Sequence, residues 1–177
     1  MFALPKTALT VLRTVTDTEN ENKTGLLTVR EKIHCFGKHE NAETRYTLIS
    51  PDNAHMALET EEISRTADGC TVKKFSIDNP ALWSAETPRL YTLKTELFIN
   101  GNAVFTNYSK VGFNSIKIKG NRLLVNGKEE KLHGVNWMCH SPYNGLAGNY
   151  EHDRESLIKF KAANVNFIRT CHNPQKR

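Results

Sequence analysis

Long hydrophobic runs are missing from this sequence of 177 residues. It contains no stretch of about 18 apolar residues, and its first five residues are too few and too soon followed by polar ones for a signal peptide. We therefore expect no membrane span and no membrane partner. Low-complexity segments are missing as well, and a hydrophobic fraction of 38% is typical of a folded globular protein rather than a disordered one.

Cysteines are few and widely spaced, at Cys35, Cys70, Cys139 and Cys171. No C-x-x-C pair occurs, and the density is far below that of a small domain held together by disulfides. We expect reduced thiols, which favour a cytoplasmic location, although secreted enzymes of this size also keep free cysteines.

A concentrated basic segment is missing too. The formal net charge is +5, but the lysines and arginines are scattered along the chain. Nucleic-acid binding needs basic residues gathered on one face or in one run. We expect no nucleic-acid partner, and the sequence is compatible with a homo-oligomer without indicating one.

Short β-rich runs separated by turn residues fill the first two thirds of the chain. Asn100-Gly101 is a hairpin signal, and Ser50-Pro51-Asp52-Asn53 is a candidate type I turn. About seven strands in about 110 residues are typical of an immunoglobulin-like β-sandwich, which we assign to residues 1–113. The predicted strands span residues 9–15, 26–36, 44–49, 72–77, 90–99 and 104–111.

The pattern changes in residues 114–177. Asn126-Gly127 predicts a tight hairpin, which leads into the apolar run 133–136. A helix is predicted from about Asp153, as its cap, to Ala163, and residues 165–170 predict a strand. Strand, helix and parallel strand are how a (β/α)8 barrel begins, so the fold class is mainly β, a sandwich followed by a partial barrel.

Three motifs carry a resemblance to a known family. They are residues 79–93 (NPALWSAETPRLYTL), the passage from 111–113 through 123–128 to 133–136 (VGF, LLVNGK, HGVN), and residues 166–174 (NFIRTCHNP). In order and spacing they resemble glycoside hydrolase family 2 of the β-galactosidase type. The resemblance implies that this chain is an internal fragment, containing the sandwich domain and the start of the catalytic barrel.

Two positions depart from the family pattern. The loop after the first barrel strand usually reads Arg-His-Glu-His-His-Pro, whereas residues 137–142 here read WMCHSP, so that only His140 and Pro142 remain. The aromatic residue expected before Pro174 is Asn173. These changes affect the expected sugar specificity rather than the family.

The resemblance implies retaining hydrolysis of terminal β-D-galactosides by two glutamates, an acid/base and a nucleophile, on later barrel strands. No catalytic residue is therefore assigned in this chain. His172 is expected to bind sugar hydroxyls, and Arg169 to hold the missing nucleophile ionised. Asn136, Trp137 and His140, at the end of the first strand, are candidates for the same pocket or for packing.

Other interpretations stay open. Cys139-His140 and Cys171-His172 together offer a zinc ligand set, but not at a known spacing, so we assign no metal to this chain. The resemblance implies Mg and Na in the parent enzyme, bound elsewhere. Trp83 is expected in the sandwich core, the alternative being a sugar-stacking platform. A non-catalytic binding or scaffold module is the alternative function.

Overall fold

The structure is a computed structural model, and it describes residues 7–35, 41–138, 145 and 149–171. The chain divides into two compact units, Met1–Glu129 and Glu130–Arg177. The predicted fold class, a mainly β chain with a sandwich followed by the start of a barrel, is confirmed.

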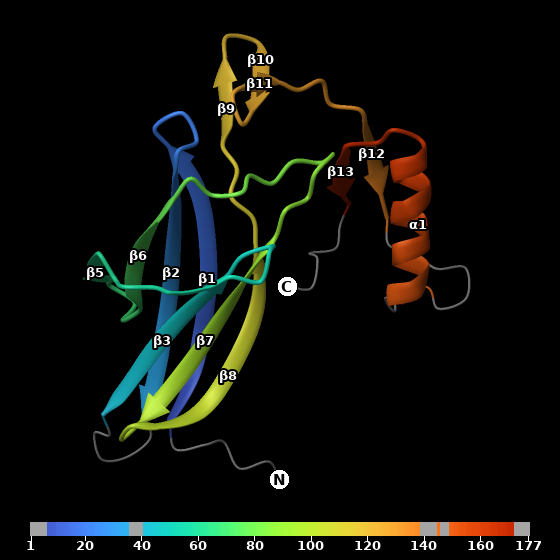
Figure 1. The fold of residues 1–177 in the computed structure, drawn as a ribbon. Coiled ribbons are helices and arrows are strands. Elements are labelled where there is room, and N and C mark those ends of the chain that lie inside the picture. Colours follow the sequence, from blue (N-terminus) through green and yellow to red (C-terminus); the bar gives the residue numbers. More distant parts are fainter. Residues whose placement is uncertain (1–6, 36–40, 139–144, 146–148, 172–177) are drawn as a thin grey trace. The chain divides into compact units, whose positions relative to one another are not determined.

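Two antiparallel sheets of four strands each form the sandwich of the first unit (Figure 1). Every predicted strand is present, and two short strands, β4 (His55–Ala57) and β5 (Glu62–Arg65), bring the number in the described part of the sandwich to eight instead of about seven. One sheet has the order β1 (Thr7–Glu19), β2 (Thr24–Cys35), β6 (Thr71–Asp78), β5 (Glu62–Arg65). The other has the order β4 (His55–Ala57), β3 (Ala42–Ile49), β7 (Tyr91–Ile99), β8 (Asn102–Val111).

The core lies between these sheets because the strands alternate inward apolar and outward polar residues. In β7 every second residue is buried, from Tyr91 through Leu93 to Leu97. Aromatic rings from the two sheets pack edge to face across the core. The ring centroids of Tyr46 and Phe75 are 5.4 Å apart, and the angle between the ring planes is 60°. The core cluster comprises Leu27, Val29, Tyr46, Leu48, Phe75, Ile77, Tyr91, Leu93, Val111 and Phe113.

The segment that follows β6 closes one end of the sandwich. Leu82 pairs with Phe113 in an isolated bridge, and Tyr91 packs edge to face on Phe113 with the ring centroids 5.2 Å apart. Leu82 is packed against the core. The prediction that Trp83 lies in the core was wrong: its side chain is only partly buried and lies outside the core cluster, although its N–H donates a 2.8 Å bond to Phe113 O.

A three-stranded sheet follows, formed by β9 (Ile116–Lys119), β10 (Arg122–Val125) and β11 (Lys128–Glu129). Its predicted turn is confirmed, since Asn126 and Gly127 both have positive φ, 51° and 80°, as a two-residue hairpin of this type requires. The Asn126 side chain accepts a bond from Ser115 N–H (3.0 Å) and donates to Trp83 O (2.9 Å). The hairpin is thereby hydrogen-bonded to the sandwich.

The second unit is a strand-helix-strand unit: β12 (Gly134–Trp137), α1 (Tyr150–Ala162) and the parallel strand β13 (Phe167–Thr170). The predicted cap was wrong. Asn149, not Asp153, caps α1, because its side-chain oxygen accepts bonds from the N–H groups of Glu151 and His152, and the helix therefore starts earlier. Within the described residues no helix has the length and apolar character needed to cross a bilayer.

Candidate functional site

The candidate site is the carboxyl end of the parallel pair β12–β13, the edge where barrel enzymes carry their functional residues. The register places Asn136 directly opposite Arg169. Arg169 donates a bond from Nη1 to Asn136 Oδ1 at 3.3 Å. The structure thus brings together two of the five residues that were singled out from the sequence.

The face on which this pair lies follows from the alternation of side chains along a strand. Trp137, the next residue, packs on Phe160 of α1 with the ring centroids 6.1 Å apart and an interplanar angle of 82°. Because successive strand side chains point to opposite faces, Asn136 and Arg169 point away from α1. In a (β/α)8 barrel that face is the interior. Trp137, one of the candidates for the pocket, packs on the helix instead.

Arg169 remains able to bind a further group. A guanidinium carries five N–H donors in a fixed fork, and within the described residues its bond to Asn136 uses one of them. The other donors suit a carboxylate, which such a fork binds through two parallel bonds. Asn136 therefore restrains the rotamer of Arg169 without saturating it.

His140 and His172, two further predicted site residues, lie outside the described residues, as does Cys139. Cys171 is described and partly buried. Its N–H donates to Trp137 O at 3.0 Å, which extends the strand pairing by one residue. Among the described residues, no three His, Cys, Asp or Glu side chains gather as metal ligands would.

The carboxylates of the second unit lie outside both strands. Glu130 precedes the amino end of β12, while Glu151, Asp153 and Glu155 lie on α1. Neither the described part of the strand ends nor the printed sequence at 139–148 and 171–177 offers an Asp or Glu. The oxygen ligands that Mg prefers are therefore poorly represented here, and the residues of this edge do not fit the Mg and Na sites of the expected parent enzyme.

The sequence interpretation missed a polar cluster at the opposite, amino end of the pair. The Asn166 side chain accepts a bond from His133 N–H (2.8 Å) and donates to Lys131 O (3.0 Å) and to Glu130 Oε1 (2.6 Å). Asn166 opens the motif at 166–174. A polar residue at the start of a predicted apolar strand was the signal that could have identified it.

A buried ion pair inside the sandwich was also missed. Glu31 Oε1 lies 2.9 Å from Lys73 Nζ and accepts a bond from Thr44 Oγ1 at 2.8 Å, while the Tyr46 hydroxyl donates to Glu31 Oε2. Burial and this hydrogen bond raise the pKa of Tyr46 above its ordinary value of 10.0. The cluster links β2 and β6 of one sheet to β3 of the other, which is a structural role.

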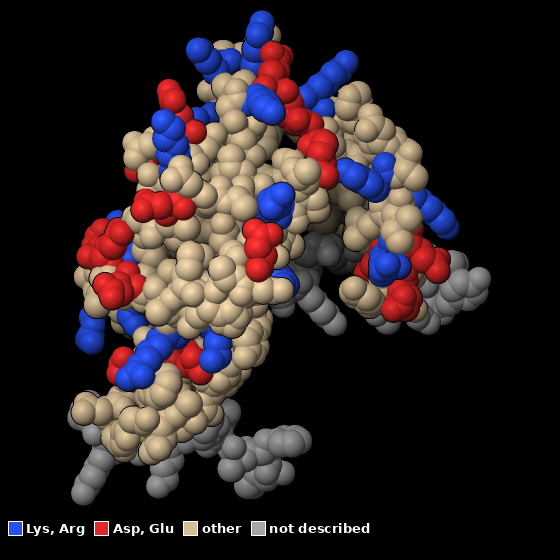
Figure 2. All heavy atoms as spheres, in the orientation of Figure 1, with Lys and Arg blue, Asp and Glu red and all other residues tan. Residues whose placement is uncertain are grey.

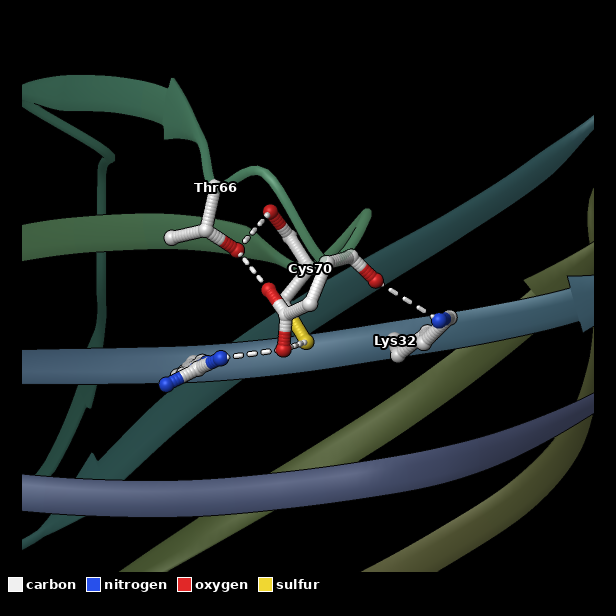
Figure 3. Close-up of polar contacts among 5 residues, drawn as sticks. Lys32, Thr66 and Cys70 are labelled. Carbon is white, nitrogen blue, oxygen red and sulfur yellow. Dashed lines mark hydrogen bonds and ion pairs between the residues drawn. The ribbon is translucent and has the colours of Figure 1, made fainter.

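Figure 3 shows a second polar cluster, at the turn between β5 and β6. The carboxylate of Asp68 accepts bonds from Thr66 Oγ1 and, at 3.4 Å, from Cys70 Sγ, and it pairs with Arg30. The Thr66 bond is the main cause that lowers the pKa of Asp68 below its ordinary value of 3.8. Lys32 Nζ donates to Asp68 O at 2.7 Å, so the cluster fastens the turn to β2.

Figure 2 shows acidic and basic side chains interspersed over the visible face. Several of the exposed charges form ion pairs between neighbouring strands, for example Lys74 with Glu62 (2.8 Å) and Arg122 with Glu129 (3.1 Å). The charge on the visible face is therefore mixed, and no single-sign patch there marks a binding site for a charged partner.

Comparison with known proteins identifies both units. The family model for glycosyl hydrolases family 2 matches residues 7–113. The model for the TIM barrel domain of the same family matches residues 116–177. The second match includes the β9–β11 hairpin, which the structure attaches to the sandwich.

Curated relatives agree with these matches. The chain is 32% identical over 162 residues to a β-galactosidase of Priestia megaterium, covering 88% of this chain and 16% of that protein. It is 34% identical over 137 residues to a β-galactosidase of Staphylococcus xylosus, covering 77% of this chain and 12% of that protein. The chain thus spans less than a fifth of the length of these relatives.

Among solved structures, the fold resembles that of a β-glucuronidase of Parabacteroides merdae. The TM-score is 0.80 at 23% identity, with 97% of this chain and 22% of that chain covered. At this identity the likeness concerns the fold.

Proposed function

This chain belongs to family 2 of the glycosyl hydrolases, and we propose that the complete protein is a retaining glycosidase acting on terminal β-D-galactosides. The galactoside is supported by the curated relatives, which are named β-galactosidases. Solved β-glucuronidases share the fold, so glucuronides are the competing substrate class.

The observation that carries the proposal is the pairing of Arg169 with Asn136 on the face of β12–β13 away from α1. A retaining glycosidase needs a nucleophilic carboxylate that is ionised when it attacks the anomeric carbon. A guanidinium beside it lowers its pKa and fixes its orientation. In this proposal Asn136 fixes Arg169, and Arg169 holds the nucleophile.

The carboxylates themselves come from outside these 177 residues in this proposal. Retention requires two carboxyl groups about 5 to 5.5 Å apart across the scissile bond. Within the second unit Glu130 lies at the amino end of the strand pair, and Glu151, Asp153 and Glu155 lie on α1. His172 and His140, on the segments that follow β13 and β12, contribute hydrogen bonds to sugar hydroxyls, which help the reaction where they strengthen in the transition state.

Assays of the 177-residue chain and of the complete protein test this proposal. The chain alone should leave nitrophenyl β-D-galactoside unhydrolysed, while the complete protein should hydrolyse it in preference to the β-D-glucuronide. Preference for the glucuronide would overturn the substrate class. Turnover by the chain alone would overturn the assignment of the carboxylates, and a complete protein without hydrolytic activity would favour a binding or scaffold module.

A further inference from the structure

The register of β12 against β13 decides whether Arg169 meets Asn136. A slip of one residue would place Arg169 opposite Val135 or Trp137, whose side chains lie on the other face. The strands have only four residues each, so few backbone hydrogen bonds hold this register. Other contacts are needed to specify it.

Three sets of contacts at the amino end of the pair supply that specification. The ring of Phe167 covers Gly134: a Cβ on Gly134 would lie 2.7 Å from Phe167 Cδ1, a contact that real Cβ atoms do not make. The carboxamide of Asn166 makes three bonds to the segment that leads into β12. The backbone N–H groups of Asn166 and Phe167 both donate to His133 O, at 3.0 and 3.3 Å.

We propose that Asn166 is a positioning residue for the catalytic face: its carboxamide clamps residues 130–133 to the start of β13 and so sets the register that brings Arg169 beside Asn136. All three bonds of its side chain run to the chain before β12, and none to its own strand. The bond to Glu130 is charge-assisted, which makes it the strongest of the three. The catalytic importance of this clamp rests on the proposed function, whereas its effect on register does not.

The test is nuclear magnetic resonance of the isotope-labelled 177-residue chain, in which cross-strand contacts of Asn136 with Arg169 report the register. Asn166→Ala should abolish them. Asn149→Ala is the matched control, because Asn149 also uses its carboxamide oxygen to bind backbone N–H groups, but at the cap of α1. It should loosen the helix and leave the Asn136–Arg169 contacts in place.

An exchange of groups tests the clamp even if Asn166→Ala unfolds the unit. Asn166→Asp sets two carboxylates against each other and should lose the cross-strand contacts. Adding Glu130→Gln restores a donor-acceptor pair and should recover them. The proposal is overturned if the unchanged chain lacks these contacts, if Asn149→Ala removes them as fully as Asn166→Ala, or if the double variant recovers nothing. If substitution of Arg169 left the activity of the complete enzyme unchanged, the proposed function would be refuted. The effect of Asn166 on the strand register would still stand.

Discussion

The ammonium group of Lys73 lies 2.9 Å from the carboxylate of Glu31 in the interior of the sandwich, with 13% and 3% of the two side chains exposed. Lys74, the next residue of β6, makes a similar 2.8 Å pair with Glu62, but both of those side chains are more than half exposed. The two ion pairs have nearly the same distance but differ in burial. Comparing them therefore shows how burial, rather than geometry, changes what an ion pair contributes to the free energy of unfolding.

Lys73→Met should lower the free energy of unfolding by about 3 kcal/mol, because the Glu31 carboxylate would stay buried without its cation. Lys74→Met, the same change one residue along, should cost about 0 to 1 kcal/mol, since water screens the surface pair. Denaturant unfolding of both variants measures the difference. Equal losses would contradict the buried-pair interpretation.

Phe113→Ala should cost about 3 to 5 kcal/mol, because its ring is fully buried and packs on Tyr91. Trp83→Ala should cost clearly less, about 1 to 2 kcal/mol, because its side chain is only partly buried and its bonds to Phe113 and Asn126 use its backbone, which alanine keeps. Thermal unfolding compares the two. A loss for Trp83→Ala as large as that for Phe113→Ala would restore the core assignment made from the sequence.

Acid should weaken the turn at Asp68, and the hydrogen bond from Thr66 should lower the pH at which this happens. The pKa of Asp68 is lower in the folded chain than its ordinary 3.8, so its ionised form favours folding above that pH, and this contribution is lost as the pH falls through the lower folded value. Thr66→Val removes the main cause and should raise the pKa of Asp68, whereas Thr66→Ser keeps the hydroxyl and should not. Carbon-detected nuclear magnetic resonance measures the pKa of the Asp68 carboxyl in each variant. Equal pKa values in Thr66→Val and Thr66→Ser would refute the prediction.

Amide exchange should be slower in the first unit than in the second. The second unit leaves large apolar side chains in water: Leu157 is 43%, Ile158 52% and Phe167 45% exposed. Few buried apolar contacts mean a low free energy of local opening. Hydrogen exchange at several protein concentrations checks this, and protection of β13 that rises with concentration would indicate packing against a second copy. Protection of β13 equal to that of β7 in a demonstrated monomer would contradict the prediction.

Local signals predicted most of the fold. Alternation of apolar residues located the strands, and Asn126-Gly127 located its turn, because both depend on neighbours in the sequence. The short strands β4 and β5 escaped, since three or four residues carry too little periodicity. Asn149 was missed as a cap because Asp153, four residues later, is also a residue type that commonly caps helices.

The contacts that the sequence could not predict are those between distant residues. Glu31 follows Leu27 and Val29 in the inward-facing series of β2, so its position was readable, but not its partner Lys73 on β6. Likewise, Arg169 and Asn136 were each candidates, yet only the parallel register places one beside the other. The clamp at Asn166 depends on the same register, and it therefore emerged only with the structure.

We expect the catalytic face at the carboxyl end of β12 and β13. The pH-rate profile of the complete protein carrying Arg169→Gln tests this most directly. The account predicts that kcat falls by about 10²-fold and that the acidic limb of kcat/KM moves to higher pH, because the nucleophile loses the cation that lowers its pKa. Arg154→Gln, on the exposed surface of α1, should leave both unchanged. An Arg169→Gln enzyme with the kcat and acidic limb of the unchanged protein would contradict the account.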